Sequence, residues 1–134
     1  MRLKRTLVVA IALLSACKLP TPAEQMDSIQ SWLATAGMVG EAWLRHTTPD
    51  KYSRETLELS RETLFKISAD LLASLPPATD SAMLDSILVR SRGRVDRMAR
   101  LIAARNAPEF ARQLDSLRAD EKLVKALSEG MPKQ

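Results

Sequence analysis

Proline breaks at regular intervals constrain the fold of this chain more than any other feature. They fall at Pro49, at the pair Pro76-Pro77 and at Pro108. A proline inside a helix removes a hydrogen bond and clashes with the preceding turn, so helices begin or end close to such residues. Between the breaks the apolar residues recur every three or four positions, which is the period of a helix with one buried face. No alternation of polar and apolar residues is long enough to predict a strand.

Four helices are therefore expected, over residues 23–45, 49–74, 81–105 and 108–129. Because the links between them are short, consecutive helices should run antiparallel. The predicted fold is all-α, an antiparallel up-down-up-down four-helix bundle formed by residues 24–130 and followed by a short tail, 131–134.

Capping residues and apolar stripes support these boundaries. Thr48 is expected to cap the second helix, whose first position is a proline, and Asp80 to cap the third. Asn106 or Ala107 should cap the fourth helix, and Gly130 should follow its end. The predicted core stripes of the four helices are Met26, Ile29, Leu33, Ala36, Val39, Gly40, Trp43 and Leu44; Leu57, Leu64, Ile67, Leu71 and Leu75; Leu84, Ile87, Leu88, Val95, Met98 and Ile102; and Phe110, Leu114, Leu117, Val124 and Leu127.

Arginines are concentrated in the third helix, where residues 90–105 carry six Arg against one Asp. Four of them share about a third of the helix circumference. These are Arg90, Arg94, Arg97 and Arg100. One hypothesis is a surface for anionic lipid headgroups or an acidic partner. Nucleic acid is not expected as a partner, because no aromatic residues are interleaved with the arginines.

The alternative is that these arginines pair with carboxylates of the second helix. Folding the two helices back on each other at Pro76 sets Glu58 level with Arg97 and Glu55 level with Arg100. The third acidic residue of that face is Glu62. Such pairs would flank the seam between the helices and set its register, since exposed ion pairs contribute only about 0–1 kcal/mol each.

Aromatic residues suggest a second candidate site. Trp32 and Trp43 lie three helical turns apart and so point almost the same way, and Tyr52 should lie near Trp43. They could line a groove for an apolar ligand or a partner helix, or form the edge of the core. Gly37 and Gly40 lie between the tryptophans. A mid-helix glycine costs about 1 kcal/mol relative to alanine, which predicts close approach of another helix there or a kink.

Three further positions have a specific expected role. Gly93 raises the possibility of a local break in the third helix. His46, the only histidine, is expected to interact with the free carbonyls at the end of the first helix. Glu121 lies close to the apolar stripe of the fourth helix and is expected at its edge, with a buried acid as the alternative.

Catalysis and metal binding are not expected. The single histidine has no partner for nucleophilic chemistry, and no glycine-rich phosphate loop is present. A metal site would need further His or Cys ligands. The prediction is a non-enzymatic protein without a catalytic site and without a bound metal.

The N-terminal segment is expected to direct export and not to form part of the bundle. Arg2, Lys4 and Arg5 precede an apolar run over residues 7–14, which is shorter than the about 20 residues that a spanning helix needs. This order is typical of a secretory signal peptide. The run ends in Leu14-Ser15-Ala16-Cys17, which resembles the lipobox of bacterial lipoproteins. The resemblance implies cleavage before Cys17 and attachment of a diacylglycerol and acyl lipid to its thiol.

Lipid on Cys17, the only cysteine, would consume the one free thiol and leave the exported domain without a disulfide. Removal of residues 1–16 takes three cations from a whole-chain charge of +4, leaving about +1. Residues 17–23 then form a proline-containing tether. The alternatives are a conventionally cleaved signal, an uncleaved membrane anchor and a buried cytosolic helix.

The expected function follows from the predicted signal peptide and lipidation site and from the missing catalytic groups. The chain should be an exported lipoprotein, anchored to a cell-envelope membrane on its periplasmic side or at the cell surface. It should act as an interaction module for another envelope protein, with no cofactor beyond the covalent lipid. The alternative is a helical carrier or sensor that holds an apolar small molecule near the tryptophans. No oligomeric state is predicted.

Overall fold

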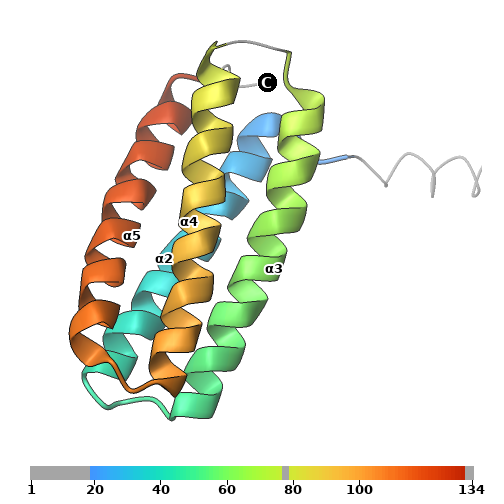
Figure 1. Cartoon of the computed structure of the whole chain (residues 1–134). Helices are drawn as coiled ribbons and strands as arrows, with labels where there is room; N and C mark the ends of the chain where they lie inside the picture. The colour runs from blue at the N-terminus through green and yellow to red at the C-terminus, as the bar shows by residue number, and fades with distance from the viewer. Residues whose placement is uncertain (1–18, 77–78, 132–134) are drawn as a thin grey trace, which may run out of the picture.

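Four helices form the part of the chain that the computed structural model describes, residues 19–76 and 79–131. They are α2 (Pro22–Leu44), α3 (Asp50–Ser74), α4 (Thr79–Ala103) and α5 (Ala107–Glu129). No strand occurs among these residues. Each helix packs against the next, and α5 packs against α2, so the four surround one core (Figure 1). The prediction of an all-α helical bundle is confirmed.

The predicted signal peptide and lipidation site lie outside the described residues. Residues 1–16 and Cys17 are not among the described residues, nor are residues 132–134 of the predicted tail. Of the helices that are described, none combines the length and the apolar character that crossing a membrane requires.

Two of the predicted caps are confirmed, and a third cap appears at the start of α2. Asn106 Oδ1 accepts a hydrogen bond from the Glu109 backbone N–H at 3.2 Å, and Gly130 is the C-cap of α5. α2 begins at Pro22, so the last two residues of the predicted tether are helical. Thr21 Oγ1 caps this helix by accepting from the Glu24 backbone N–H at 3.2 Å.

Two predicted caps are wrong. α3 begins at Asp50 with Pro49 at the N-cap, and Thr48 Oγ1 instead lies 2.8 Å from Ser53 Oγ. α4 begins at Thr79, which places Asp80 inside the first turn. An acidic side chain there still faces the positive end of the helix dipole.

α2 and α4 end in left-handed residues that are not glycine. The positive φ values are 58° at His46 and 54° at Arg105. The His46 N–H donates to Trp43 O at 3.0 Å and the Thr47 N–H donates to Ala42 O at 2.9 Å. This pair of bonds is the Schellman motif, which satisfies carbonyls at a helix end. His46 thus closes α2 through its backbone and its φ, whereas a cationic side chain was predicted to do so.

The core stripes are largely as predicted, with α3 as the exception. The predicted leucines of α3 alternate with buried serines, which were not predicted. The buried serines of α3 are Ser53, Ser60 and Ser68. Ser60 Oγ donates to Thr56 O at 2.8 Å, which satisfies the hydroxyl within its own helix. Among the predicted core residues, Trp43, Leu44, Ile67, Leu75 and Leu127 are only partly buried.

Two glycines of α2 mark close approaches, as predicted. A Cβ on Gly40 would lie 3.0 Å from Met98 Cε and 3.1 Å from Leu114 Cδ1. A Cβ on Gly37 would lie 2.5 Å from Arg118 Nη1, so a side chain of α5 crosses the helix there. Gly93 differs from both, because nothing lies within 4 Å of its Cβ position. α4 is continuous through Gly93, so the predicted break is wrong.

The left-handed helix ends give a stability prediction. His46→Gly should raise the free energy of unfolding by about 1 kcal/mol, because a left-handed residue with a Cβ is strained by roughly 1–2 kcal/mol and glycine is not. The measurement is urea denaturation followed by circular dichroism. His46→Ala is the control and should bring no such gain, because it keeps the Cβ. A glycine variant less stable than the wild type would contradict the assignment.

Candidate functional site

A buried carboxylate joins α4 to α5. Asp120 of α5 is only 2% exposed. Its Oδ1 accepts hydrogen bonds from Arg90 Nη2 at 2.7 Å and Arg90 Nε at 3.2 Å. Its Oδ2 accepts from Arg94 Nε at 2.9 Å and from Ser91 Oγ at 3.2 Å. Both carboxylate oxygens are thus satisfied, which a buried charge requires if it is not to destabilise the fold.

Asp120 was not predicted from the sequence, where Glu121 is the acid that the stripe suggests as a buried alternative. Glu121 lies at the edge of the α5 stripe, as expected, and accepts a hydrogen bond from Arg118 Nη1 at 3.2 Å. Asp120 falls three residues after Leu117 and four before Val124, both of which are buried. That spacing puts a carboxylate on the core face of α5, next to a helix rich in arginine.

The predicted pairing of the α4 arginines with α3 is wrong. Arg97 Nη2 lies 3.7 Å from Glu109 Oε1 of α5, and Arg100 Nη2 lies 3.1 Å from Asp96 Oδ2 of its own helix. None of the ion pairs among the described residues joins Arg90, Arg94, Arg97 or Arg100 to Glu55, Glu58 or Glu62. The arginine face of α4 is turned toward α5 because Asp120 supplies the buried partner.

The predicted register of α3 against α4 is nevertheless close. Arg61 Nε of α3 lies 3.7 Å from Asp96 Oδ1 of α4, and the Arg92 guanidinium lies 4.9 Å from the ring centre of Phe65. These neighbours lie within one turn of the predicted alignment. The charges across the seam are the reverse of the predicted ones, with an arginine on α3 and a carboxylate on α4.

Arg118 ties α5 to α2 where it crosses Gly37. Its Nη2 donates to Glu41 Oε1 at 3.0 Å, while its Nη1 bonds Glu121. Burial lowers the pKa of Arg118, but the hydrogen bonds to Glu41 and Glu121 outweigh burial and raise this pKa above its usual value. Arg118 therefore stays charged and acts as a structural tie.

The tryptophans form the edge of the core. The Trp43 ring packs on Phe110 with 4.5 Å between ring centres, and Trp43 Nε1 donates to Asp50 Oδ1 at 2.9 Å. Trp32 is partly buried against the core, and Tyr52 is exposed. Neither of the two pockets described below includes Trp32, Trp43 or Tyr52. Of the two roles considered for the tryptophans, the core edge therefore fits better than the groove.

A hollow opens on the outer surface between α3 and α4, with a volume of about 220 Å³. We call it the α3–α4 hollow. It is lined by Arg61, Phe65, Val89, Arg92, Gly93 and Asp96. Phe65 is 59% exposed and Val89 is 52% exposed, so the hollow offers apolar surface to solvent. Arg92 lies over the Phe65 ring and closes one side of the hollow.

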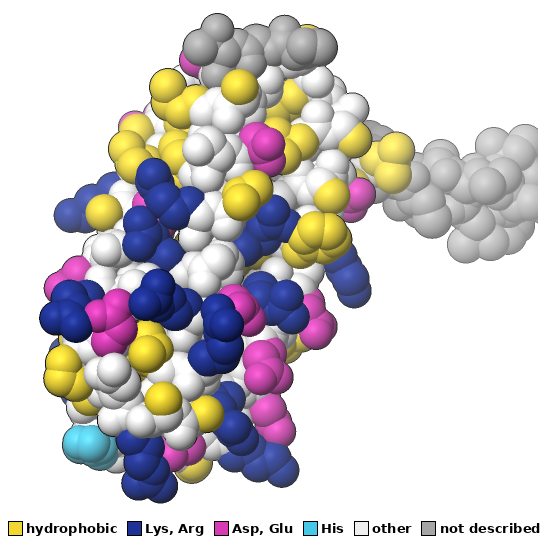
Figure 2. Space-filling model, viewed as in Figure 1, with side chains coloured by type: hydrophobic (Ala, Val, Ile, Leu, Met, Phe, Trp, Pro, Cys, Tyr) yellow, Lys and Arg dark blue, Asp and Glu magenta, His cyan; other side chains and the backbone are white. Residues whose placement is uncertain are grey.

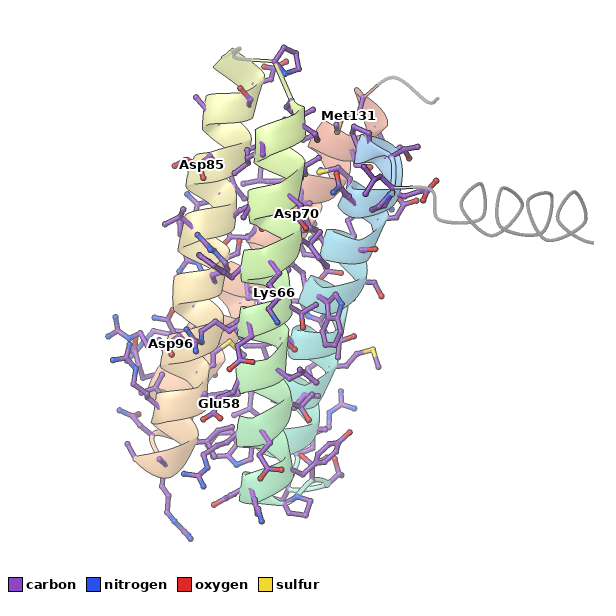
Figure 3. The ribbon with its side chains drawn as sticks, turned by 90° about the vertical axis from the view of Figure 1, so that its right-hand side faces the viewer. Glu58, Lys66, Asp70, Asp85, Asp96 and Met131 are labelled. Atoms are coloured by element: carbon purple, nitrogen blue, oxygen red, sulfur yellow. The ribbon has the colours of Figure 1, made fainter. Side chains whose placement is uncertain are left out.

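A larger pocket of about 480 Å³ lies at the end of the bundle where α2 begins. We call it the anchor-end pocket. It is lined by Thr21, Pro22, Ala23, Ser74, Leu75, Pro76, Asp80, Ser81, Leu84, Ala126, Leu127, Gly130 and Met131. All four helices contribute to it, and Figure 3 shows Met131 beside the start of α2. Toward this end apolar side chains gather on the face drawn in Figure 2, whereas charged side chains crowd the opposite half.

Comparison with protein-family models, with curated proteins and with solved structures found no match to this chain. Within residues 19–76 and 79–131, no cluster of His, Cys, Asp and Glu side chains is arranged to hold a metal ion.

The Asp120 cluster predicts a thermodynamic cycle. The double variant Arg90→Met/Arg94→Met should lower the free energy of unfolding by about 3–5 kcal/mol, because it leaves Asp120 buried and unpaired. Adding Asp120→Leu should recover most of that loss, since an apolar replacement of a buried ion cluster is close to neutral. Urea denaturation of the three proteins measures both steps.

The matched control for this cycle is Arg97→Met/Arg100→Met. These side chains are 58% and 73% exposed, so their loss should change stability by at most about 1 kcal/mol. A triple variant as unstable as the Arg90/Arg94 double variant would contradict the buried role of Asp120. A control variant that loses as much free energy of unfolding as that double variant would contradict it too.

Proposed function

We propose that the chain is an exported lipoprotein, held on a cell-envelope membrane by lipid on Cys17, whose bundle is a non-enzymatic binding module for another envelope protein. The lipobox resemblance of residues 14–17 supports the anchor. The proposal takes the bundle as antiparallel with up-down-up-down topology. The packing of each helix against its neighbours in the chain supports this topology.

The observation that carries the binding role is Gly93 in the α3–α4 hollow. A glycine inside a helix costs about 1 kcal/mol relative to alanine unless something needs the space. At Gly37 and Gly40 a Cβ atom would contact neighbouring side chains of the same molecule. The Cβ position of Gly93 faces open space. No neighbour within the described residues accounts for this glycine, and a group from another molecule would have room to approach it.

The surroundings of Gly93 suit a partner helix. Phe65 and Val89 offer exposed apolar area, and the Arg92 guanidinium holds the Phe65 ring in place. An amphipathic helix lying along the α3–α4 seam could cover both apolar side chains and approach Gly93 closely. Arg61 and Asp96, which also line the hollow, would give the contact a polar rim.

The α4 arginines are a weaker candidate for the binding surface. Arg90 and Arg94 are engaged by Asp120, so a partner would have to compete with a buried carboxylate for them. Arg97 and Arg100 remain accessible and could add charge at the edge of the contact. The alternative function, a carrier for an apolar molecule beside the tryptophans, has less support because the larger pocket lies at the other end of α2.

Cross-linking in intact cells tests the binding surface. A photoreactive phenylalanine analogue at position 65 should give one adduct of defined mass with a partner protein. The matched control is the same analogue at Leu59, which is 52% exposed on the same helix but about 120° away around it. Val89→Glu should reduce the adduct from position 65 about tenfold, because burying an unpaired carboxylate costs more than about 1.4 kcal/mol. Adducts of equal yield from positions 59 and 65 would refute the assignment.

Gly93→Ala separates stability from binding. It should raise the free energy of unfolding by about 1 kcal/mol, because alanine is the better helix former and the site has room for its methyl group. The same change should weaken the adduct from position 65, because the methyl group keeps the partner at a distance. A variant that is more stable and cross-links as strongly as the wild type would show that Gly93 has no part in binding.

A further inference from the structure

We propose that the anchor-end pocket holds one acyl chain of the lipid on Cys17 of the same molecule. This inference rests on the proposed function, because it requires that Cys17 is lipidated. It assigns the pocket an occupant that is covalently attached to the protein, where the carrier hypothesis would assign it a free ligand.

The tether brings the lipid to the pocket. Thr21, Pro22 and Ala23 line the pocket, and Thr21 follows Cys17 by four residues. An extended chain spans at most about 3.6 Å per residue, so the Cα atom of Cys17 lies within about 14 Å of the Cα atom of Thr21. A chain attached to the Cys17 thiol therefore starts within reach of the pocket. Such a tether gives an effective concentration on the order of millimolar, which favours the attached chain over free lipid.

The lining suits hydrocarbon. Its apolar members come from α2, α4, α5 and the segments that follow α3 and α5. They include Leu75, Leu84, Ala126, Leu127 and Met131. The volume of about 480 Å³ lies in the range of roughly 300–1,000 Å³ that is usual for small-molecule sites. The pocket is therefore large enough for a ligand and offers mainly apolar contacts.

The charge of the lining distinguishes between sources of acyl chains. Among its described residues, Asp80 is the charged one and no Lys or Arg is present. A free fatty acid brings a carboxylate and a phospholipid brings a phosphate, both of which Asp80 disfavours. The acyl groups on a lipidated cysteine are joined through neutral ester or amide bonds. The pocket thus favours the chain's own anchor over either free lipid.

Occupancy would have two consequences. The pocket would shelter hydrocarbon from water while the protein is away from the membrane. It would also fasten the ends of all four helices to the tether, because each helix contributes to the lining.

The test uses the full chain in the cells that export it. The cells are fed a palmitate analogue carrying an alkyne and a diazirine, irradiated, and the purified protein is digested for mass spectrometry. Adducts are expected on pocket peptides, above all those containing Leu84 or Ala126. Ala126→Trp should incorporate the same amount of label but lose the pocket adduct at least tenfold. Ala119→Trp, at an exposed position of α5 outside the lining, is the matched control and should keep the adduct.

The outcomes separate the pocket from the anchor. If Cys17 carries the label but adducts form only with membrane lipids, the pocket assignment is overturned. The proposal that the chain is a lipoprotein would still stand. Equal adducts in the Ala126→Trp and Ala119→Trp variants would overturn it as well. Absence of label from the wild-type protein would overturn the lipid anchor itself, and the pocket assignment with it.

Discussion

The pairing of Asp120 with Arg90 and Arg94 determines which face of α4 the molecule presents. Burial of this carboxylate turns residues 90, 91 and 94 toward α5. Since successive residues are about 100° apart around a helix, Val89 and Gly93 are then directed outward. The α3–α4 hollow exists because α4 has this rotation. A buried charge with no acceptable alternative partner selects one arrangement of the helices, which is the role best documented for buried ionic groups.

The helices and most of the core follow from periodicity and proline breaks, but the rotation of α4 does not. Arg90 and Arg94 flank the apolar stripe, and periodicity alone allows them to face either neighbouring helix. The carboxylates expected to attract them, Glu55, Glu58 and Glu62, form an obvious cluster in the sequence. Asp120 falls on the apolar stripe of α5, but no cluster of carboxylates in the sequence marks it as the partner of the arginines. The buried serines of α3 were missed for a related reason, because a small polar residue inside a helix bundle is visible only once its neighbours are known.

The candidate sites were harder to predict than the fold. A pocket built from the ends of all four helices depends on how those ends splay, which no single stripe encodes. The hollow depends on Gly93, which the sequence marked as unusual without saying whether a neighbour inside the molecule explains it. The two sites also differ in kind. The pocket lies at the end of the bundle where α2 begins, and the hollow lies between α3 and α4 on the flank of the bundle.

The central claim is that Asp120 holds Arg90 and Arg94 against α5 while Arg97 and Arg100 stay accessible, and nitrogen-15 NMR of the arginine Nε–H groups tests it directly. Arg94 Nε donates to a buried carboxylate, so its proton should exchange slowly with water. The proton of Arg100, whose side chain is 73% exposed, should exchange fast. Asp120→Asn should accelerate the exchange of Arg94 and leave that of Arg100 unchanged. Equal exchange at the two arginines in the wild-type protein would contradict this account.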